Sequence, residues 1–403
     1  MQGANATIRA VNALAARWAG EIRADGNSVF SAAGVWPLLA FLADGAEGAA
    51  RKELADALGV PADQAAGAAR GLLAGMDAMR GLDPALGLWT NRTLELRESW
   101  AAGLPTGAHG VLTGDAEADR AALDAWAAKR TGGLVEAMPV TVTDRTELVL
   151  ASALALRTRW LRPFQEGGLL DTPYWPEGDV LSLTRESALP DRLGVADTPD
   201  GQVTELKVLG DNALDVHLLL GEEQMTPGQV LGAGVGLLSR RYPVVPGSRL
   251  PYGAAGPGVY VARERSETPD PPTLRVTTPA FDVAAGHDLL RQHELFGLTT
   301  ARDTLHGHFP GISGTQPLAI ESGGQSAVAR FGATGFEAGV VTAFGAVGCG
   351  VPRTRWLVTT VRARFDRPFG FLALHRHSRL VLAAGWVADP ERLTEDPYDS
   401  EDF

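Results

Sequence analysis

The chain has very little cysteine and lysine. Cys349 is the single cysteine among its 403 residues, which excludes an intramolecular disulfide bond. Lysine occurs three times, so arginine supplies nearly all of the remaining positive charge. Together with the 48 glycines and abundant alanine, this usage is typical of a GC-rich bacterial gene. We therefore expect a bacterial protein without internal disulfide bonds.

Long apolar runs are also missing. No run of 18 apolar residues occurs, so the pattern of an ordinary membrane-spanning helix is absent. Residues 1–23 lack the basic segment and the apolar block of a signal peptide. Apolar residues recur there at helical spacing instead: Ile8, Val11, Leu14, Ala15 and Trp18. This segment predicts an amphipathic helix, and cytoplasmic localisation is the default expectation.

The chain carries an excess of negative charge. Its net charge of −12 argues against nucleic acid or an anionic membrane as the main partner, because both are themselves negative. Part of the excess lies in residues 391–403, which contain six acidic side chains and one arginine. This composition predicts a disordered, solubilising tail.

The order of helical and extended patterns predicts an α+β protein. Residues 148–156 are apolar throughout and too short for most buried helices, so they predict a central strand buried on both faces. Because no linker separates two balanced halves, residues 1–390 are expected to form one domain. The stretch 222–272 is rich in proline, glycine and charge, and predicts an insertion or flexible excursion. Helical patterns come first and extended patterns follow: 31–44, 46–58 and 117–130, then 203–208, 215–220, 274–283, 357–363 and 379–387.

Familiar catalytic signatures are absent. The sequence has no Gly-x-Ser-x-Gly motif, no phosphate-binding Gly-x-x-x-x-Gly-Lys and no complete dinucleotide-binding glycine motif. Two His-x-His pairs, His306/His308 and His375/His377, would each share one face of a strand, which is a geometry that suits a metal ion. Neither pair has a third ligand nearby in the sequence. Surface histidines are the favoured interpretation, and no metal or cofactor is expected.

Cys349 lies in a run of small and β-forming residues, 335–350, whose only charge is Glu337. Such a run suits either an exposed loop or a β-strand. A thiol becomes a nucleophile only where a base or a positive environment favours the thiolate. Arg353 and Arg355 are close in sequence, but no histidine is. Three interpretations stay open: an incidental loop residue, a residue that a protease recognises, and a catalytic thiol.

A series of short motifs, taken in order along the chain, resembles those of the serpin family. The resemblance runs from about residue 8 to about residue 390 and depends on the order and spacing of the motifs. The matching segments are Asn27-Ser-Val-Phe-Ser31, Gly45-Ala-Glu-Gly48, Leu123-Asp-Ala-Trp126 with 131–133, 148–150 continuing to Trp160 and Phe164, Pro279-Ala-Phe281, Gly311-Ile-Ser313, and Phe365-Asp-Arg-Pro-Phe369 with Gly385 and Pro390.

The resemblance implies three β-sheets, about nine helices and an exposed reactive loop, here residues 333–356. It also implies a monomeric inhibitor whose partner is a serine or cysteine protease. In the family mechanism the protease cleaves the loop, which then inserts as an extra strand into the large central sheet. Family spacing places the reactive bond at Cys349–Gly350. Arg353 or Arg355 would attract a trypsin-like protease if the bond is displaced.

The hinge of the loop departs from the family pattern. The resemblance assigns it to Gly335, Phe336, Glu337, Ala338 and Gly339. Phe336 stands where inhibitory members carry threonine or serine, and every second inserted side chain faces the core. A ring in a slot shaped for a hydroxyl is expected to cost about 1–3 kcal/mol, unless the site is reshaped.

Other departures lie along the insertion path. The lysine–glutamate pair of the family maps to Ala280 and Ala333, so both charges are absent and neither is left unpaired. The family has a polar switch beneath the sheet, which more often consists of Ser, Ser, Asn and His. In this chain it corresponds to Ser31, Gly34, Ser152 and Gln325. The tryptophan that ends the central strand corresponds to Trp160.

Three functions are compatible with these residues. The first is a protease inhibitor that acts by loop cleavage and insertion. The second is a non-inhibitory serpin used as a binding module. The third is an enzyme on a serpin scaffold that uses Cys349 in a bacterial biosynthetic pathway. The fold alone does not choose among them.

Overall fold

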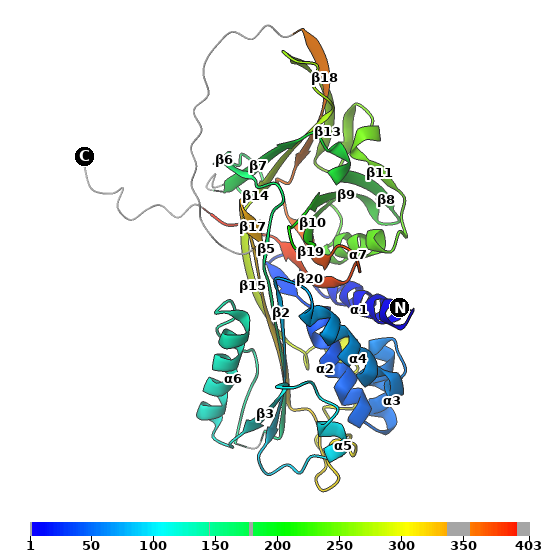
Figure 1. Cartoon of the computed structure of the whole chain (residues 1–403), viewed down its shortest axis with the longest axis vertical. Helices are drawn as coiled ribbons and strands as arrows, with labels where there is room; N and C mark the ends of the chain where they lie inside the picture. The colour runs from blue at the N-terminus through cyan, green and yellow to red at the C-terminus, as the bar shows by residue number, and fades with distance from the viewer. Residues whose placement is uncertain (1, 145, 177–179, 337–354, 393–403) are drawn as a thin grey trace, which may run out of the picture.

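Three β-sheets and a layer of helices make up the molecule, which is elongated (Figure 1). The computed structural model describes residues 2–144, 146–176, 180–336 and 355–392. Within these ranges it contains eight α-helices and two short 3-10 helices, η1 (Pro190–Arg192) and η2 (Gly247–Arg249). The predicted α+β architecture with three sheets is confirmed.

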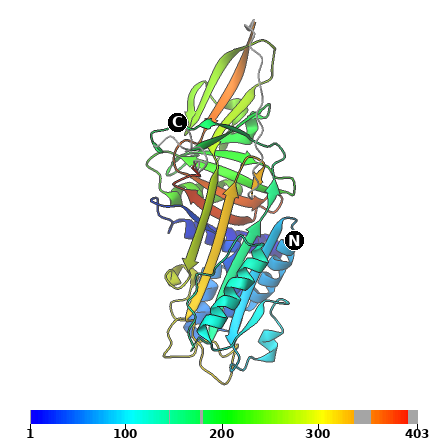
Figure 2. The same ribbon diagram turned by 90° about the vertical axis from the view of Figure 1, so that its left-hand side faces the viewer.

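The main sheet runs along the long axis of the lower half (Figure 2). Its order is β3-β2-β4-β16-β17-β5, and β15 pairs with the free edge of β16. The apolar run at 148–156 forms a central strand that is buried throughout, as predicted. The strands are β2 (Leu82–Asn91), β3 (His109–Leu112), β4 (Leu148–Leu156), β5 (Thr158–Arg159), β15 (Phe281–Asp288), β16 (Ser322–Phe331) and β17 (Gly335–Phe336).

Helices cover both faces of the main sheet. Figure 1 shows α6 on one face, and α2, α3 and α4 on the other. Helix α2 is buried along nearly its whole length, because its sequence is apolar on every side. The helices are α1 (Gln2–Ala19), α2 (Ala32–Gly45), α3 (Gly48–Leu58), α4 (Ala62–Asp77), α5 (Glu98–Ala101), α6 (Ala116–Thr131), α7 (Pro227–Leu238) and α8 (His293–Phe296).

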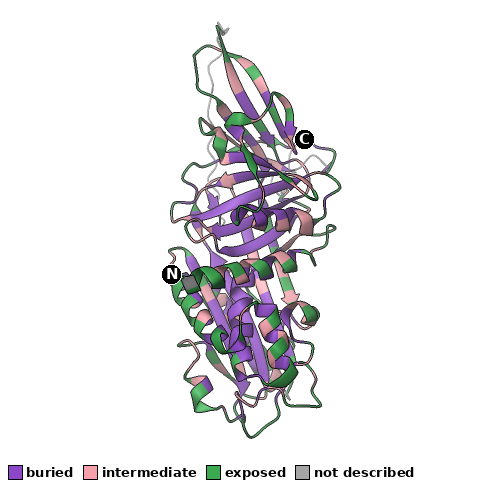
Figure 3. Ribbon diagram, turned by 90° about the vertical axis from the view of Figure 1, so that its right-hand side faces the viewer, coloured by how far each residue is buried: buried purple, intermediate pink, exposed green. Residues whose placement is uncertain are grey.

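The inner sheet crosses the middle of the molecule and is largely buried (Figure 3). Its order is β1-β20-β19-β10-β9-β8-β11. Strands β10 and β20 are buried at every position; β20 is an apolar run, whereas β10 also buries Asp215 and His217. The strands are β1 (Ser28–Phe30), β8 (Leu193–Thr198), β9 (Gly201–Val208), β10 (Leu214–Gly221), β11 (Val244–Pro246), β19 (Phe369–His375) and β20 (Val381–Val387).

The top sheet forms the upper end of the molecule (Figure 1). Its order is β12-β13-β18-β14-β7-β6, so β18, which follows the expected reactive loop, lies between two other strands. The strands are β6 (Gln165–Leu169), β7 (Leu181–Ser187), β12 (Gly253–Gly256), β13 (Val259–Ser266), β14 (Thr273–Pro279) and β18 (Trp356–Arg364).

Two sequence-based expectations differ from the structure. The stretch 222–272 is not a flexible excursion, because it supplies α7, β11 and the β12–β13 hairpin to the two upper sheets. Its prolines and glycines mark turns between short elements. The extended pattern at 274–283 divides at Ala280 into β14 and β15, which belong to different sheets. Periodicity along the chain does not reveal which sheet a strand joins.

Candidate functional site

The candidate site is the seam between β4 and β16 in the main sheet. The two strands pair directly in parallel from Val149 and Ser322 to Leu154 and Ala327. Over this stretch they are neighbours, so the sheet is closed there. Above it the strands separate, and β17 occupies the space between β16 and β5.

Strand β17 contains the first two residues of the expected hinge. Phe336 pairs with Phe331 of β16 on one side and with Thr158 of β5 on the other. The chain reaches this position through a tight turn, in which the Gly332 amide donates to the Gly335 carbonyl at 3.0 Å. A Cβ atom at Gly335 would collide with the Thr158 carbonyl oxygen, so the glycine is required by the close approach of the two backbones.

The segment before β17 is bonded to the chain that follows β5. The amide of Trp160 donates to the Thr334 carbonyl at 2.9 Å, and the amide of Phe164 donates to the Ala333 carbonyl at 2.8 Å. The indole Nε1 of Trp160 also donates to the Gly332 carbonyl, at 2.9 Å. These bonds hold residues 332–334 against the upper end of the sheet.

Phe336 already lies in the hydrophobic core. Its side chain is 3% exposed, and its ring centroid lies 6.3 Å from that of Phe371 in the inner sheet. Phe331, Phe281 and Phe371 form a stack beside it, with successive centroids 5.2 and 5.0 Å apart. The site is therefore shaped for a ring, and the expected cost of placing Phe336 in a smaller slot does not apply in this state.

Small residues provide part of that space. Ala280 is 5% exposed and Ala333 packs against the same core. They stand where the family carries a charged pair, so the upper end of this sheet is closed by apolar contacts. Phe336 is buried among these contacts in the described state.

The polar residues of the expected switch meet beneath the seam. Gln325 of β16 accepts a hydrogen bond from the Ser31 amide at 2.7 Å and donates one to the Ser31 carbonyl at 2.8 Å. The Ser31 hydroxyl caps α2 through the Gly34 amide at 3.0 Å and donates to the Leu382 carbonyl at 2.5 Å. Ser152 of β4 faces Gln325 in the paired register. The structure thus brings these residues together.

Two features of this cluster were not visible in the sequence. The hydroxyl of Ser152 is buried and makes no hydrogen bond among the described residues. A Cβ atom at Gly34 would lie 2.5 Å from that hydroxyl, so the glycine leaves room for the serine. His287 of β15 pairs with Gln325 in register, and its Nε2 donates to the Val29 carbonyl at 2.9 Å. Burial lowers the pKa of His287, and its hydrogen bond to the Val29 carbonyl opposes this only in part.

Several expected site residues lie outside the described part of the chain. They are Glu337, Ala338 and Gly339 of the hinge, the Cys349–Gly350 bond and Arg353. Arg355 is described and exposed, and its amide donates to the Ser266 carbonyl at 3.0 Å, immediately before β18 begins.

The two histidine pairs have local partners. The His306 ring bonds Asp303 and the His375 ring bonds Ser378, at 3.0 and 2.9 Å. The described residues contain no group of three or more histidine, cysteine, aspartate or glutamate side chains that could hold a metal ion. Nor does any helix in the described ranges have the length and apolar character that a membrane crossing requires.

The known proteins that this chain resembles are serpins. The model of the serpin (serine protease inhibitor) family matches residues 6–180. A protein named serine protease inhibitor from Cyanea capillata is 23% identical, with 91% of this chain and 93% of that protein covered. The putative serpin-Z6A of Oryza sativa subsp. japonica is 26% identical, over 91% of this chain and 94% of that protein. The chain is therefore similar to serpins over nearly its whole length.

Solved structures agree with this assignment at the level of the fold. Thyroxine-binding globulin in complex with thyroxine superposes with a TM-score of 0.72 at 17% identity, covering 96% of this chain and 99% of that one. Tengpin, a thermophilic serpin in its native state, superposes with a TM-score of 0.71 at 14% identity, covering 96% and 94%. Both likenesses extend over nearly the whole chain, so the serpin fold is shared throughout.

Proposed function

We propose that this serpin inhibits a serine or cysteine protease by acting as a suicide substrate. The protease would cleave the reactive loop within residues 333–356 and remain attached as an acyl-enzyme. The cleaved loop would then enter the seam between β4 and β16 and become a new strand of the main sheet.

The position of β17 is the observation that carries this proposal. It lies at the upper end of the seam and is already paired on both sides, while β4 and β16 are closed directly beneath it. A strand that continues downward from β17 would exchange one β4–β16 ladder for two new ladders. The gain in backbone hydrogen bonds and burial is the driving force for insertion.

The register of β17 predicts which loop side chains would face the core. Continuing it by two residues places Ala338 opposite Ala329, whose side chain is buried. Gly339 would then lie opposite Val328, which is only half-buried on the other face of the sheet. Glu337 would share that second face, where a charge is tolerated.

This alternation gives a test with a matched control. Ala338→Glu would bury an unpaired carboxylate after insertion and is expected to abolish inhibition, whereas Gly339→Glu adds the same charge on the outer face and should largely keep it. Each protein is incubated with a panel of serine and cysteine proteases. The readouts are an SDS-stable complex and the melting temperature after loop cleavage. Clipping of the natural protein by every protease, without a complex or a rise in melting temperature, would rule out the inhibitory mechanism.

The cleaved bond is predicted to be Cys349–Gly350, with Arg353 as the alternative. Arg355 is a poorer candidate, since its amide is held by Ser266 and β18 starts at the next residue. A protease needs an extended segment that is free to enter its active site. Intact mass measurement after cleavage identifies the bond, and a cut after Arg355 would contradict this ranking.

A second candidate is a serpin that binds a ligand or partner without inhibiting a protease. The buried ring of Phe336 favours it, because the hinge is fastened to the core before any cleavage. In that case the cleaved and intact proteins should melt at the same temperature. The enzyme hypothesis remains distinguishable, since it requires an activity that Cys349→Ala would remove.

A further inference from the structure

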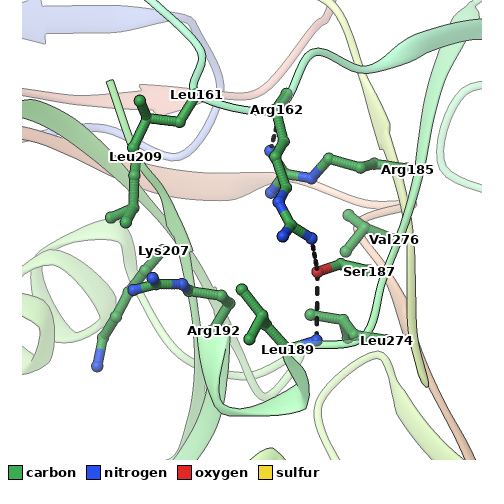
Figure 4. A pocket seen from close by; sticks show the side chains of 10 residues that line it. All are labelled: Leu161, Arg162, Arg185, Ser187, Leu189, Arg192, Lys207, Leu209, Leu274 and Val276. Carbon is green, nitrogen blue, oxygen red and sulfur yellow. Dashed lines mark hydrogen bonds between the residues drawn. The ribbon is translucent and has the colours of Figure 1, made fainter. Parts of the chain in front are cut away.

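A small cavity lined by positive side chains opens beside the upper end of the main sheet (Figure 4). Its volume is about 80 Å³. Arg162 comes from the segment after β5, Arg185 from β7, Arg192 from η1 and Lys207 from β9. The other walls are apolar or carry the Ser187 hydroxyl. No carboxylate from the described part of the chain lines the cavity.

The three arginines have no acidic partner among the described residues. Arg162 donates to the Ser187 hydroxyl at 3.1 Å, and Arg185 donates to the Arg162 carbonyl at 2.9 Å. The Arg185 guanidinium lies 4.1 Å from the centre of the Phe164 ring. By contrast, Arg275 in the top sheet is paired with two glutamates. What distinguishes this cavity is that three arginines without a carboxylate partner converge on it, in a chain whose net charge is −12.

The electrostatics of the cavity favour an anion. Burial, followed by repulsion from Arg162 and Arg192, lowers the pKa of Arg185 to about 10. An anion between these groups would replace repulsion with charge-assisted hydrogen bonds. The planar guanidinium group is suited to oxyanions that accept two parallel hydrogen bonds, such as phosphate and sulfate.

A larger cavity of about 340 Å³ adjoins the first and shares Arg192 and Lys207 with it. It adds three further arginines, Arg240, Arg376 and Arg379. Its two carboxylates are already engaged: Glu205 with His217 at 2.7 Å, and Asp215 with Arg376 at 2.6 Å. Leucines of α7 and β19 also line it. The charged groups therefore change from basic alone in the small cavity to basic and acidic in the larger one, and apolar side chains line both.

We propose that the two cavities form one binding site for a small organic anion that carries a phosphate or sulfate group. The oxyanion would lie between Arg162, Arg185 and Arg192. The organic part would pass Lys207 and rest against the leucines of the larger cavity.

The site is connected to the hinge through one aromatic residue. Phe164, beneath the Arg185 guanidinium, donates its amide to the Ala333 carbonyl and packs edge-on against Phe331 at 5.6 Å. A ligand that draws Arg162 and Arg185 together would act on the residues that hold β17. This coupling rests on the proposed inhibitory function, whereas the binding itself does not.

Titration calorimetry with phenyl phosphate tests the binding, at constant ionic strength set with chloride. The natural protein should bind, and Arg162→Gln/Arg192→Gln should bind at least tenfold more weakly. The matched control is Arg9→Gln/Arg92→Gln, which removes two exposed arginines that have no carboxylate partner among the described residues and should not change the affinity. Melting curves establish that all three proteins are folded.

Equal affinity in the two double variants, or no binding by the natural protein at millimolar phenyl phosphate, would overturn the site. Binding of a heparin oligosaccharide without binding of phenyl phosphate would also overturn it, since the ligand would then be a surface polyanion. The rate of the melting-temperature rise after loop cleavage, with and without phenyl phosphate, tests the coupling. Binding with an unchanged rate refutes only the coupling, and inhibition without binding refutes only the site.

Discussion

The lower and upper parts of the seam in the main sheet are held together differently. In the lower part, β4 and β16 are joined by a backbone ladder in which each pair contains at least one small residue, as in Ala151 and Gly324. In the upper part, β17 lies between β16 and β5, and large buried rings, including those of Phe331 and Phe336, pack there. The ladder in the lower part can separate without disrupting the packing of rings. Separating the strands in the upper part would expose buried apolar surface. The structure thus combines a seam that can open with an anchored hinge.

Truncation of Phe336 should show the largest effect. Phe336→Ala removes a ring that is 3% exposed and leaves a cavity among the stacked phenylalanines. Loss of a buried phenylalanine side chain typically destabilises by about 3–5 kcal/mol. Urea unfolding measures the change, and Phe336→Leu should recover part of it. A loss below about 1 kcal/mol would show that the upper part is not held by this ring.

Gln325→Leu tests the polar cluster under the lower seam. The substitution leaves the buried Ser31 amide without its acceptor, whereas the Ser31 carbonyl keeps the Gly34 and Val35 amides as donors. We expect a loss of about 1–3 kcal/mol, which is the cost of leaving one buried polar group without a partner. Thermal and urea unfolding provide the measurement. Gln325→Glu is a useful companion, because it keeps an acceptor for the amide but removes the donor to the carbonyl.

The stability of the protein should decrease as the pH falls, and part of this pH dependence should come from His287. Its pKa is lowered in the folded state, so the unfolded chain binds the proton more readily. Its contribution to stability is complete above the unfolded pKa of about 6.5 and is lost as pH falls toward the folded pKa. His287→Gln, which retains a donor for Val29, should reduce the slope of melting temperature against pH below 6.5. An unchanged slope would assign the acid sensitivity to other groups.

Ser152→Ala should have the smallest effect. The hydroxyl is buried without a hydrogen-bond partner in the described structure, so its removal loses no bond. We expect a change within about 0.5 kcal/mol, or a slight gain, in urea unfolding. A loss comparable with that of Gln325→Leu would mean that the two strands are joined by more than their ladder.

Local patterns in the sequence predicted many of the elements. The fully apolar run at 148–156 predicted β4, and the run at 335–350 predicted a segment able to form a strand, of which 335–336 are described as β17. The position of Phe336 was not predictable in this way. Its burial depends on Phe281 and Phe371, which are distant in sequence and belong to two other strands. The small cavity lined by positive side chains was not predictable from the sequence either. Arg162, Arg185 and Lys207 come together only after three strands and their connections have packed.

The sequence by itself determined the α+β class, the central strand, the serpin motifs and the glycine at the hinge. These features depend on side-chain periodicity and backbone sterics, which act over a few residues. Only the tertiary structure decided that the seam is closed below β17, that Phe336 is core, and that unpaired arginines share one cavity. Such properties arise from contacts between segments far apart in the chain, where burial and electrostatics depend on every neighbour.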